Sequence, residues 1–102
     1  MARIFLAEKN SKFDLAPARK FGQIVFLSST PMNPFNTGDL VNLFKAGLHK
    51  EHFNRDTDYI CLTGVFSIIC IFLAVAIKLH GSVKVLMFDA KETEYRERVI
   101  EI

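Results

Sequence analysis

Polar side chains that could bind an anion gather in two stretches of the sequence, and each stretch follows an apolar run. The first spans residues 28–39 and combines hydroxyls and carboxamides with prolines and a glycine, and the second is a Thr-Gly pair after the run 58–62. Hydroxyl, carboxamide and backbone N–H groups donate hydrogen bonds to phosphates and other anions. The residues that would line such a pocket are Ser28, Ser29, Thr30, Asn33, Asn36, Thr37, Thr63 and Gly64.

The same residue types also close turns and cap helices, which is their commoner use between a strand and a helix. Asn36 or Thr37 would serve as such a cap. The sequence contains neither G-x-G-x-x-G nor G-x-x-x-x-G-K-[ST], the two glycine-rich motifs that hold phosphates. A pocket for a small anionic or nucleotide-like ligand is therefore an alternative hypothesis, and no cofactor is expected.

Two histidines, His49 and His52, are three residues apart and are followed closely by Asp56 and Asp58. A metal site needs three or four ligands in a fixed geometry, and a polar helix end with its following turn explains this cluster better. No local signature joins a nucleophile to a base. We therefore predict no metal site and no catalytic residues, and an enzyme is only the third hypothesis.

Cys61 and Cys70 both lie within the uncharged stretch 59–77. Disulfide scaffolds place cysteines in the loops of small secreted chains, and the apolar run near the N-terminus is too short for a signal peptide. We expect both cysteines to be reduced and buried as small apolar side chains. This usage indicates a cytoplasmic protein of a bacterial or infected host cell.

The elements that would position these groups follow from the apolar periodicity. It predicts helices at 40–50 and 65–80, and strands at 2–7, 23–28, 58–63, 82–88 and 95–102. The order β-β-α-β-α-β-β is typical of an α/β domain, with a small mixed, mostly parallel sheet of about five strands and two helices. The carboxyl ends of its parallel strands would bring the polar stretches to one edge.

Three local features sharpen this expectation. The continuous apolar run 23–28 is typical of a strand that is buried on both faces. Pro17 disfavours a helix in the connector 13–22, because a proline restricts the residue that precedes it. The charged residues of the strand 95–102 indicate an edge strand that is protected from pairing with other chains.

The uncharged stretch 59–77 is long enough for a membrane helix of about 20 residues, so a single-pass membrane protein is another alternative. Thr63 and Gly64 interrupt its apolar character, and Gly81 followed by the run 82–88 fits a helix end and the next strand. We favour a strand, a turn and a buried helix, and we do not expect a membrane as a partner.

The helix predicted at 65–80 is apolar around almost its whole circumference. An apolar helix face left in water forms a large exposed patch, which monomeric proteins avoid. We therefore predict that another copy of the chain or a host protein covers it, and that the segment 2–7 can add to a neighbouring sheet edge. The predicted interface residues are Phe66, Ile69, Phe72 and Leu73.

The composition narrows the class of protein. The chain has 102 residues with a net charge of +2, and half of the residues are hydrophobic, including ten phenylalanines. Its length is close to the commonest domain size of about 100–150 residues, so residues 1–102 are predicted to form a single α/β domain. A chain so apolar is not disordered, and its charge is too small to indicate nucleic-acid binding.

Three segments resemble a known group of proteins: FDLAPARKFGQIVFL (13–27), DYICLTG (58–64) and VKVLMFDAKETEYRERVI (83–100). They are similar to segments of small proteins of unknown function encoded in bacteriophage and bacterial genomes. The resemblance implies an accessory, phage-encoded, cytoplasmic protein and assigns no functional residues. Our leading hypothesis is a non-enzymatic interaction protein that acts as a homo-oligomer or on a host partner through its apolar helix.

Overall fold

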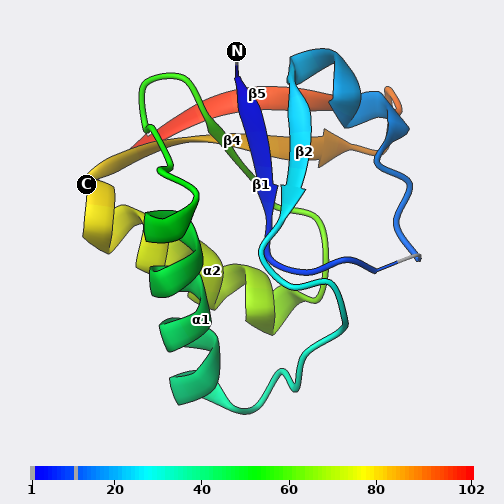
Figure 1. The fold of residues 1–102 in the computed structure, drawn as a ribbon. Coiled ribbons are helices and arrows are strands. Elements are labelled where there is room, and N and C mark those ends of the chain that lie inside the picture. The colour runs from blue at the N-terminus through cyan, green and yellow to red at the C-terminus, as the bar shows by residue number, and fades with distance from the viewer. Residues whose placement is uncertain (1, 11) are drawn as a thin grey trace.

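A computed structural model describes residues 2–10 and 12–102 of the chain (Figure 1). It contains a five-stranded sheet, two α-helices and a 3₁₀ helix, η1. The strands are β1 (Arg3–Leu6), β2 (Gln23–Phe26), β3 (Tyr59–Cys61), β4 (Ser82–Asp89) and β5 (Glu94–Glu101), and the helices are η1 (Ala16–Phe21), α1 (Thr37–Lys50) and α2 (Phe66–His80).

The sheet has the strand order β2-β1-β3-β4-β5, in which only β5 is antiparallel to its neighbour. This confirms the predicted α/β fold with a mixed, mostly parallel sheet and two main helices. The chain moves from β1 to β2 in one direction and from β2 over to β3 and β4 in the other. Because parallel crossovers are right-handed, α1 and α2 cover one face and η1 covers the other (Figure 1).

The interior strand β1, which lies between β2 and β3, contributes side chains to both hydrophobic cores. Phe5 faces α1 and α2, whereas Ile4 and Leu6 face η1, and all three are buried. On the α-helical side the rings of Phe44 in α1 and Phe72 in α2 have their centroids 4.9 Å apart. The two layers together leave β1 without an exposed face.

The prediction that residues 23–28 form a doubly buried strand was wrong. β2 lies at the edge of the sheet and is partly exposed, whereas the neighbouring interior strands β1 and β3 are buried on both faces. For the same reason, residues 2–7 cannot add to a neighbouring sheet, since β1 pairs with β2 on one side and β3 on the other. Both runs are apolar, and the local pattern carries no information on which of them is central.

The connector 13–22 also differs from expectation, because residues 16–21 form η1. Pro17 falls in the first turn of this helix, where its missing N–H group has no partner to lose. Ala18 of η1 is buried against the sheet. The connector therefore supplies the cover for the second face of the sheet.

The uncharged stretch 59–77 divides into β3, a turn and most of α2. Within the described residues, no helix combines the length and the hydropathy that crossing a membrane requires. Gly81 ends α2 as predicted, with φ 81° and a hydrogen bond from its N–H to the carbonyl of Ile77 at 2.7 Å. Cys61 is buried as expected, but Cys70 is exposed on the outer face of α2, which corrects the prediction for that thiol.

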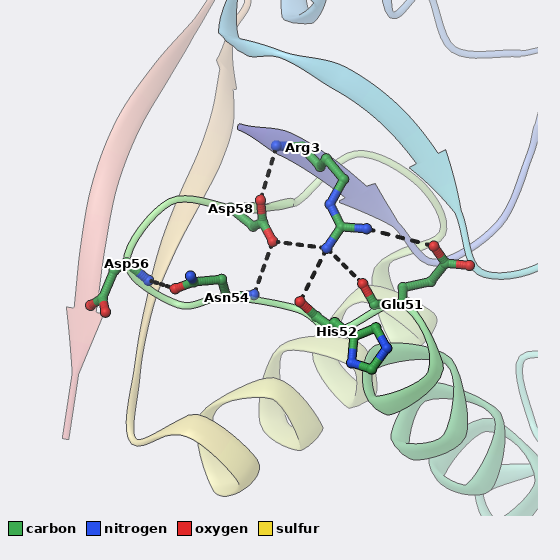
Figure 2. A network of polar contacts seen from close by, with 6 residues as sticks. All are labelled: Arg3, Glu51, His52, Asn54, Asp56 and Asp58. Atoms are coloured by element: carbon green, nitrogen blue, oxygen red, sulfur yellow. Dashed lines mark hydrogen bonds and ion pairs between the residues drawn. The ribbon is translucent and has the colours of Figure 1, made fainter. Parts of the chain in front are cut away.

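At the amino edge of the parallel strands, a polar network ties the start of β1 to the connection between α1 and β3 (Figure 2). The carboxylate of Asp58, only 2% exposed, accepts hydrogen bonds from the N–H groups of Arg3 and Asn54 and from the Arg3 guanidinium. That guanidinium also donates to the carbonyls of Glu51 at 2.6 Å and His52 at 3.1 Å. Arg3 thus satisfies carbonyl groups at the end of α1.

Candidate functional site

The carboxyl edge of the parallel strands is where the topology favours a binding site. β1 and β3 are neighbours, but the chain leaves β1 toward η1 on one face and leaves β3 toward α2 on the other. In open α/β sheets, ligands bind beside the carboxyl ends of two such strands. The loops that follow β1 and β3 are therefore the expected position of a ligand site.

A hollow of about 390 Å³ opens between these two loops. The loop after β1 contributes one wall and the turn after β3 contributes another, while Phe88 near the end of β4 and Tyr95 near the start of β5 complete it. We call this space the carboxyl-edge hollow. Its lining residues are Lys12, Phe13, Asp14, Leu62, Thr63, Gly64, Phe88 and Tyr95.

Two hydroxyl groups meet in this hollow. The Thr63 Oγ1 and the Tyr95 Oη lie 2.7 Å apart and share a hydrogen bond. Burial raises the pKa of the Tyr95 phenol, and it also raises the pKa of the nearby Cys61 thiol. Both groups therefore keep their protons at neutral pH, which suits hydrogen bonding to a ligand and not nucleophilic attack.

The first turn of α2 begins beside the hollow. Gly64 lines the hollow with φ 143°, a conformation that favours glycine, and Val65 is the N-cap residue of α2. Val65 provides no side-chain hydrogen bond to the helix. By contrast, Asn36 caps α1 by accepting a hydrogen bond from the N–H of Asp39 at 3.2 Å. The two α-helices therefore differ, since α2 begins without a side-chain cap.

Glu8 lies just beyond the end of β1 and is a buried carboxylate, 6% exposed. Its Oε2 accepts a hydrogen bond from the N–H of Met32 at 3.1 Å. Its Oε1 is buried and meets no hydrogen-bond partner within residues 2–10 and 12–102. Glu8 was not among the predicted site residues, although a charged residue directly after a strongly apolar run was a signal for it.

The structure does not bring the predicted anion-binding residues together. Thr63 and Gly64 line the carboxyl-edge hollow, whereas Asn33 and Asn36 line a smaller one at the start of α1. The remaining four lie outside both hollows: Ser28, Ser29, Thr30 and Thr37.

Several of those residues act within their own turns. Ser28 and Thr30 bond to each other, with the Ser28 hydroxyl donating to the Thr30 carbonyl at 2.7 Å. Asn33 accepts from the N–H of Phe35 at 3.0 Å. Turn closure and helix capping thus account for most of this polar loop.

A larger hollow of about 670 Å³ lies at the opposite, amino edge of the sheet. Its lining includes all three histidines of the chain together with Arg55, whose guanidinium donates to the His80 carbonyl at 2.6 Å. No three His, Cys, Asp or Glu side chains of the described residues are arranged to hold a metal ion. The neighbouring helix ends expose carbonyl groups, so this hollow is also poorly suited to an anion.

The outer face of α2 carries an apolar stripe. Phe66 is 80% exposed and Cys70 is exposed, while Leu73 and Ile77 are half-buried. We call these four residues the α2 stripe. Of the predicted interface residues, Phe66 and Leu73 belong to the stripe, Ile69 is half-buried beside it, and Phe72 is buried in the core.

One protein family, described as Phage Pam3 gp32-like protein, has a model that matches residues 4–102. No curated protein matches the chain, and no solved structure does. The match extends over almost the whole chain, including every element that contributes to the carboxyl-edge hollow and the α2 stripe.

Proposed function

The chain belongs to the Phage Pam3 gp32-like family, and we propose that this phage-associated protein is a non-enzymatic interaction protein that self-associates through the α2 stripe. The family assignment agrees with the resemblance to small phage proteins noted in the sequence. The observation that carries the proposal is the spacing of the four stripe residues along α2.

The stripe residues Phe66, Cys70, Leu73 and Ile77 follow one another at intervals of four, three and four positions. At about 100° per residue, this spacing keeps them on one line along the helix. The intervals read the same in both directions. An antiparallel second copy therefore presents a matching stripe, in which Phe66 meets the partner's Ile77 and Cys70 meets the partner's Leu73.

Such a contact is isologous, the kind of interface that two-fold symmetric dimers use. The stripe carries no charge, and the small residues Cys70 and Ala74 on this side allow two helices to approach closely. Burying one exposed Phe66 ring contributes about 1.5–3 kcal/mol. We expect a contact through one helix stripe to bury less than a standard interface of about 1,600 Å², and therefore to dissociate in roughly the micromolar range.

The test is sedimentation equilibrium across concentrations from about 1 to 200 μM with the wild-type chain and Phe66→Glu. We expect the wild-type mass to rise from 11.6 kDa toward twice that value, and the variant to remain at 11.6 kDa. Glu is tolerated at the first position of a helix because the dipole favours an anion there, so the variant should fold. The matched control is Phe35→Glu, which replaces an equally exposed ring away from the stripe and should associate like the wild type.

A second measurement tests the antiparallel geometry. In Leu73→Cys, the introduced thiol should form a disulfide with the partner's Cys70 under mild oxidation, and Cys70→Ser in the same background should prevent it. A wild-type chain that stays at 11.6 kDa throughout would exclude self-association and leave a host protein as the occupant of the stripe. Cross-linking without Cys70 would exclude the antiparallel arrangement.

A further inference from the structure

The carboxyl-edge hollow combines three aromatic rings with polar groups, although it lies away from the α2 stripe. Phe13 and Phe88 are partly exposed beside it, and the Phe88 and Tyr95 rings contact edge to face with centroids 5.2 Å apart. Tyr95 is buried beneath the hollow, only 3% exposed, so the rings open to a ligand are those of Phe13 and Phe88. Exposed aromatic faces stack on flat rings, and each such contact with a base is worth about 1–3 kcal/mol.

The hydroxyl pair of Thr63 and Tyr95 can form hydrogen bonds with polar atoms at the edge of a flat ring. Only one of the two protons is used in the contact between Thr63 and Tyr95. The other lies near the Cys61 thiol, a weak acceptor that a ligand oxygen or nitrogen can replace. Both oxygens also keep lone pairs that can accept. A ligand edge that offers a donor beside an acceptor, as nucleobases do, matches this pair.

The charged groups of the hollow suggest an orientation. Lys12 supplies one positive charge, and Gly64 leads into the first turn of α2, which has no side-chain cap. Asp14, on the remaining side, accepts a hydrogen bond from the N–H of Ala16 at 3.0 Å and would repel an anion. An anionic group therefore fits toward Lys12 and Gly64, and ring N–H groups fit toward Asp14.

From these contacts we propose that the carboxyl-edge hollow binds a nucleoside monophosphate. The base stacks on the exposed rings of Phe13 and Phe88, its edge bonds to the hydroxyl pair, and the phosphate lies toward Lys12 and the start of α2. The volume of about 390 Å³ suits a ligand of this size. The position, between loops that leave neighbouring strands toward opposite faces, is the one that α/β sheets use for such ligands.

The experiment measures binding of AMP, GMP, CMP and UMP to the full chain by isothermal titration calorimetry, with adenosine and inorganic phosphate as separate probes. At least one nucleotide should bind, and its nucleoside and phosphate should each bind at least tenfold more weakly. Phe88→Ala should weaken nucleotide binding by about tenfold or more, since it removes one stacking face. Lys12→Ala should weaken the nucleotide but leave binding of the nucleoside unchanged.

Three controls separate this proposal from loss of folding and from self-association. Lys45→Ala removes a lysine beside the amino-edge hollow, and Phe35→Ala removes an exposed ring elsewhere; both should bind like the wild type. Phe66→Glu should bind normally even where it no longer dimerises. Failure of all four nucleotides at millimolar concentration, equal losses in the control variants, or binding of single-stranded oligonucleotides alone would overturn the proposal.

Discussion

The two edges of the parallel strands differ in how completely their polar groups are satisfied. At the amino edge, the buried carboxylate of Asp58 accepts three hydrogen bonds, and the Arg3 guanidinium joins it to the end of α1 (Figure 2). At the carboxyl edge, the buried carboxylate of Glu8 has an oxygen without a partner among the described residues. The start of α2 also lacks a side-chain cap there.

This difference indicates a division of roles within one small sheet. Proteins satisfy their buried polar groups where a segment serves stability alone, and they depart from that rule where a segment serves function. The amino edge, where the polar groups are satisfied, holds the N-terminal strand against the helical layer. The carboxyl edge combines the unsatisfied groups with a hollow at the position that the topology favours for a ligand.

The strongest test of this comparison replaces each buried carboxylate by its amide. Asp58→Asn removes the charge that pairs with Arg3 and puts an NH₂ group among donors, so we expect the free energy of unfolding to fall by about 3–5 kcal/mol. Glu8→Gln preserves an acceptor for the N–H of Met32 and removes a buried charge that forms no ion pair among residues 2–10 and 12–102. We expect it to change stability by less than about 1 kcal/mol or to raise it.

Urea denaturation of both variants measures the contrast, and Asp56→Asn in the same turn as Asp58 is the control, because Asp56 is exposed. If Glu8→Gln cost as much as Asp58→Asn, the carboxyl edge would be as tightly satisfied as the amino edge. The proposed division of roles would then fail.

The order of the strands and helices along the chain could be predicted from the sequence, because strand and helix periodicities are local. Asn36 as a cap and Gly81 as a helix end were also predictable from residue type alone. The pairing order of the strands was not predictable in this way. The apolar runs of β1 and β2 look alike, and only the direction of the crossover connections places β1 in the interior and β2 at the edge.

The carboxyl-edge hollow was only half predictable. Thr63 and Gly64 follow a strand, so a loop position at the edge could be inferred for them. Phe13 comes from the loop after β1, whereas Phe88 and Tyr95 are paired on β4 and β5, far from it in the sequence. An aromatic residue in an apolar sequence is also typical of a core position, so its type did not indicate a ligand. Cys70 was misplaced because a helix that is apolar all round gives no sign of which side faces outward.

The helix starts offer a smaller test of the same comparison. Val65 has φ −69° and ψ 126°, the extended conformation of an N-cap residue, so Val65→Ser can cap α2 without strain. We expect it to stabilise the chain by about 0.5–1 kcal/mol, and Asn36→Ala to destabilise it by about 1 kcal/mol. Thermal unfolding monitored by circular dichroism measures both changes.

Capping α2 also bears on the ligand hypothesis. If the N–H groups of its first turn face a bound phosphate, Val65→Ser should weaken nucleotide binding while it raises the melting temperature. A variant that gained stability and kept its affinity would show that the phosphate lies elsewhere, and Lys12 alone would then account for recognition of the anion.

The smallest expected effect is a pH dependence from His80 at the amino edge. Partial burial, together with the nearby Arg55 guanidinium, lowers the pKa of His80 below its usual value. The unfolded chain therefore takes up a proton more readily, and stability is full above about pH 6.5 and decreases as the pH falls below it.

His80→Phe should abolish this slope between pH 7.5 and 5.5 while it preserves the contact with the Phe53 ring, 4.9 Å away. The matched control is His49→Phe, because His49 is exposed and lines the larger hollow at the amino edge together with His80; this variant should retain the slope. An unchanged slope in His80→Phe would assign the effect to another group. The effect is small because His80 remains partly in water, where solvent weakens its interaction with Arg55. Even so, the sign of the pH dependence distinguishes two cases. A histidine that the fold keeps neutral loses stability as the pH falls, whereas one whose charged form binds an anion would gain it.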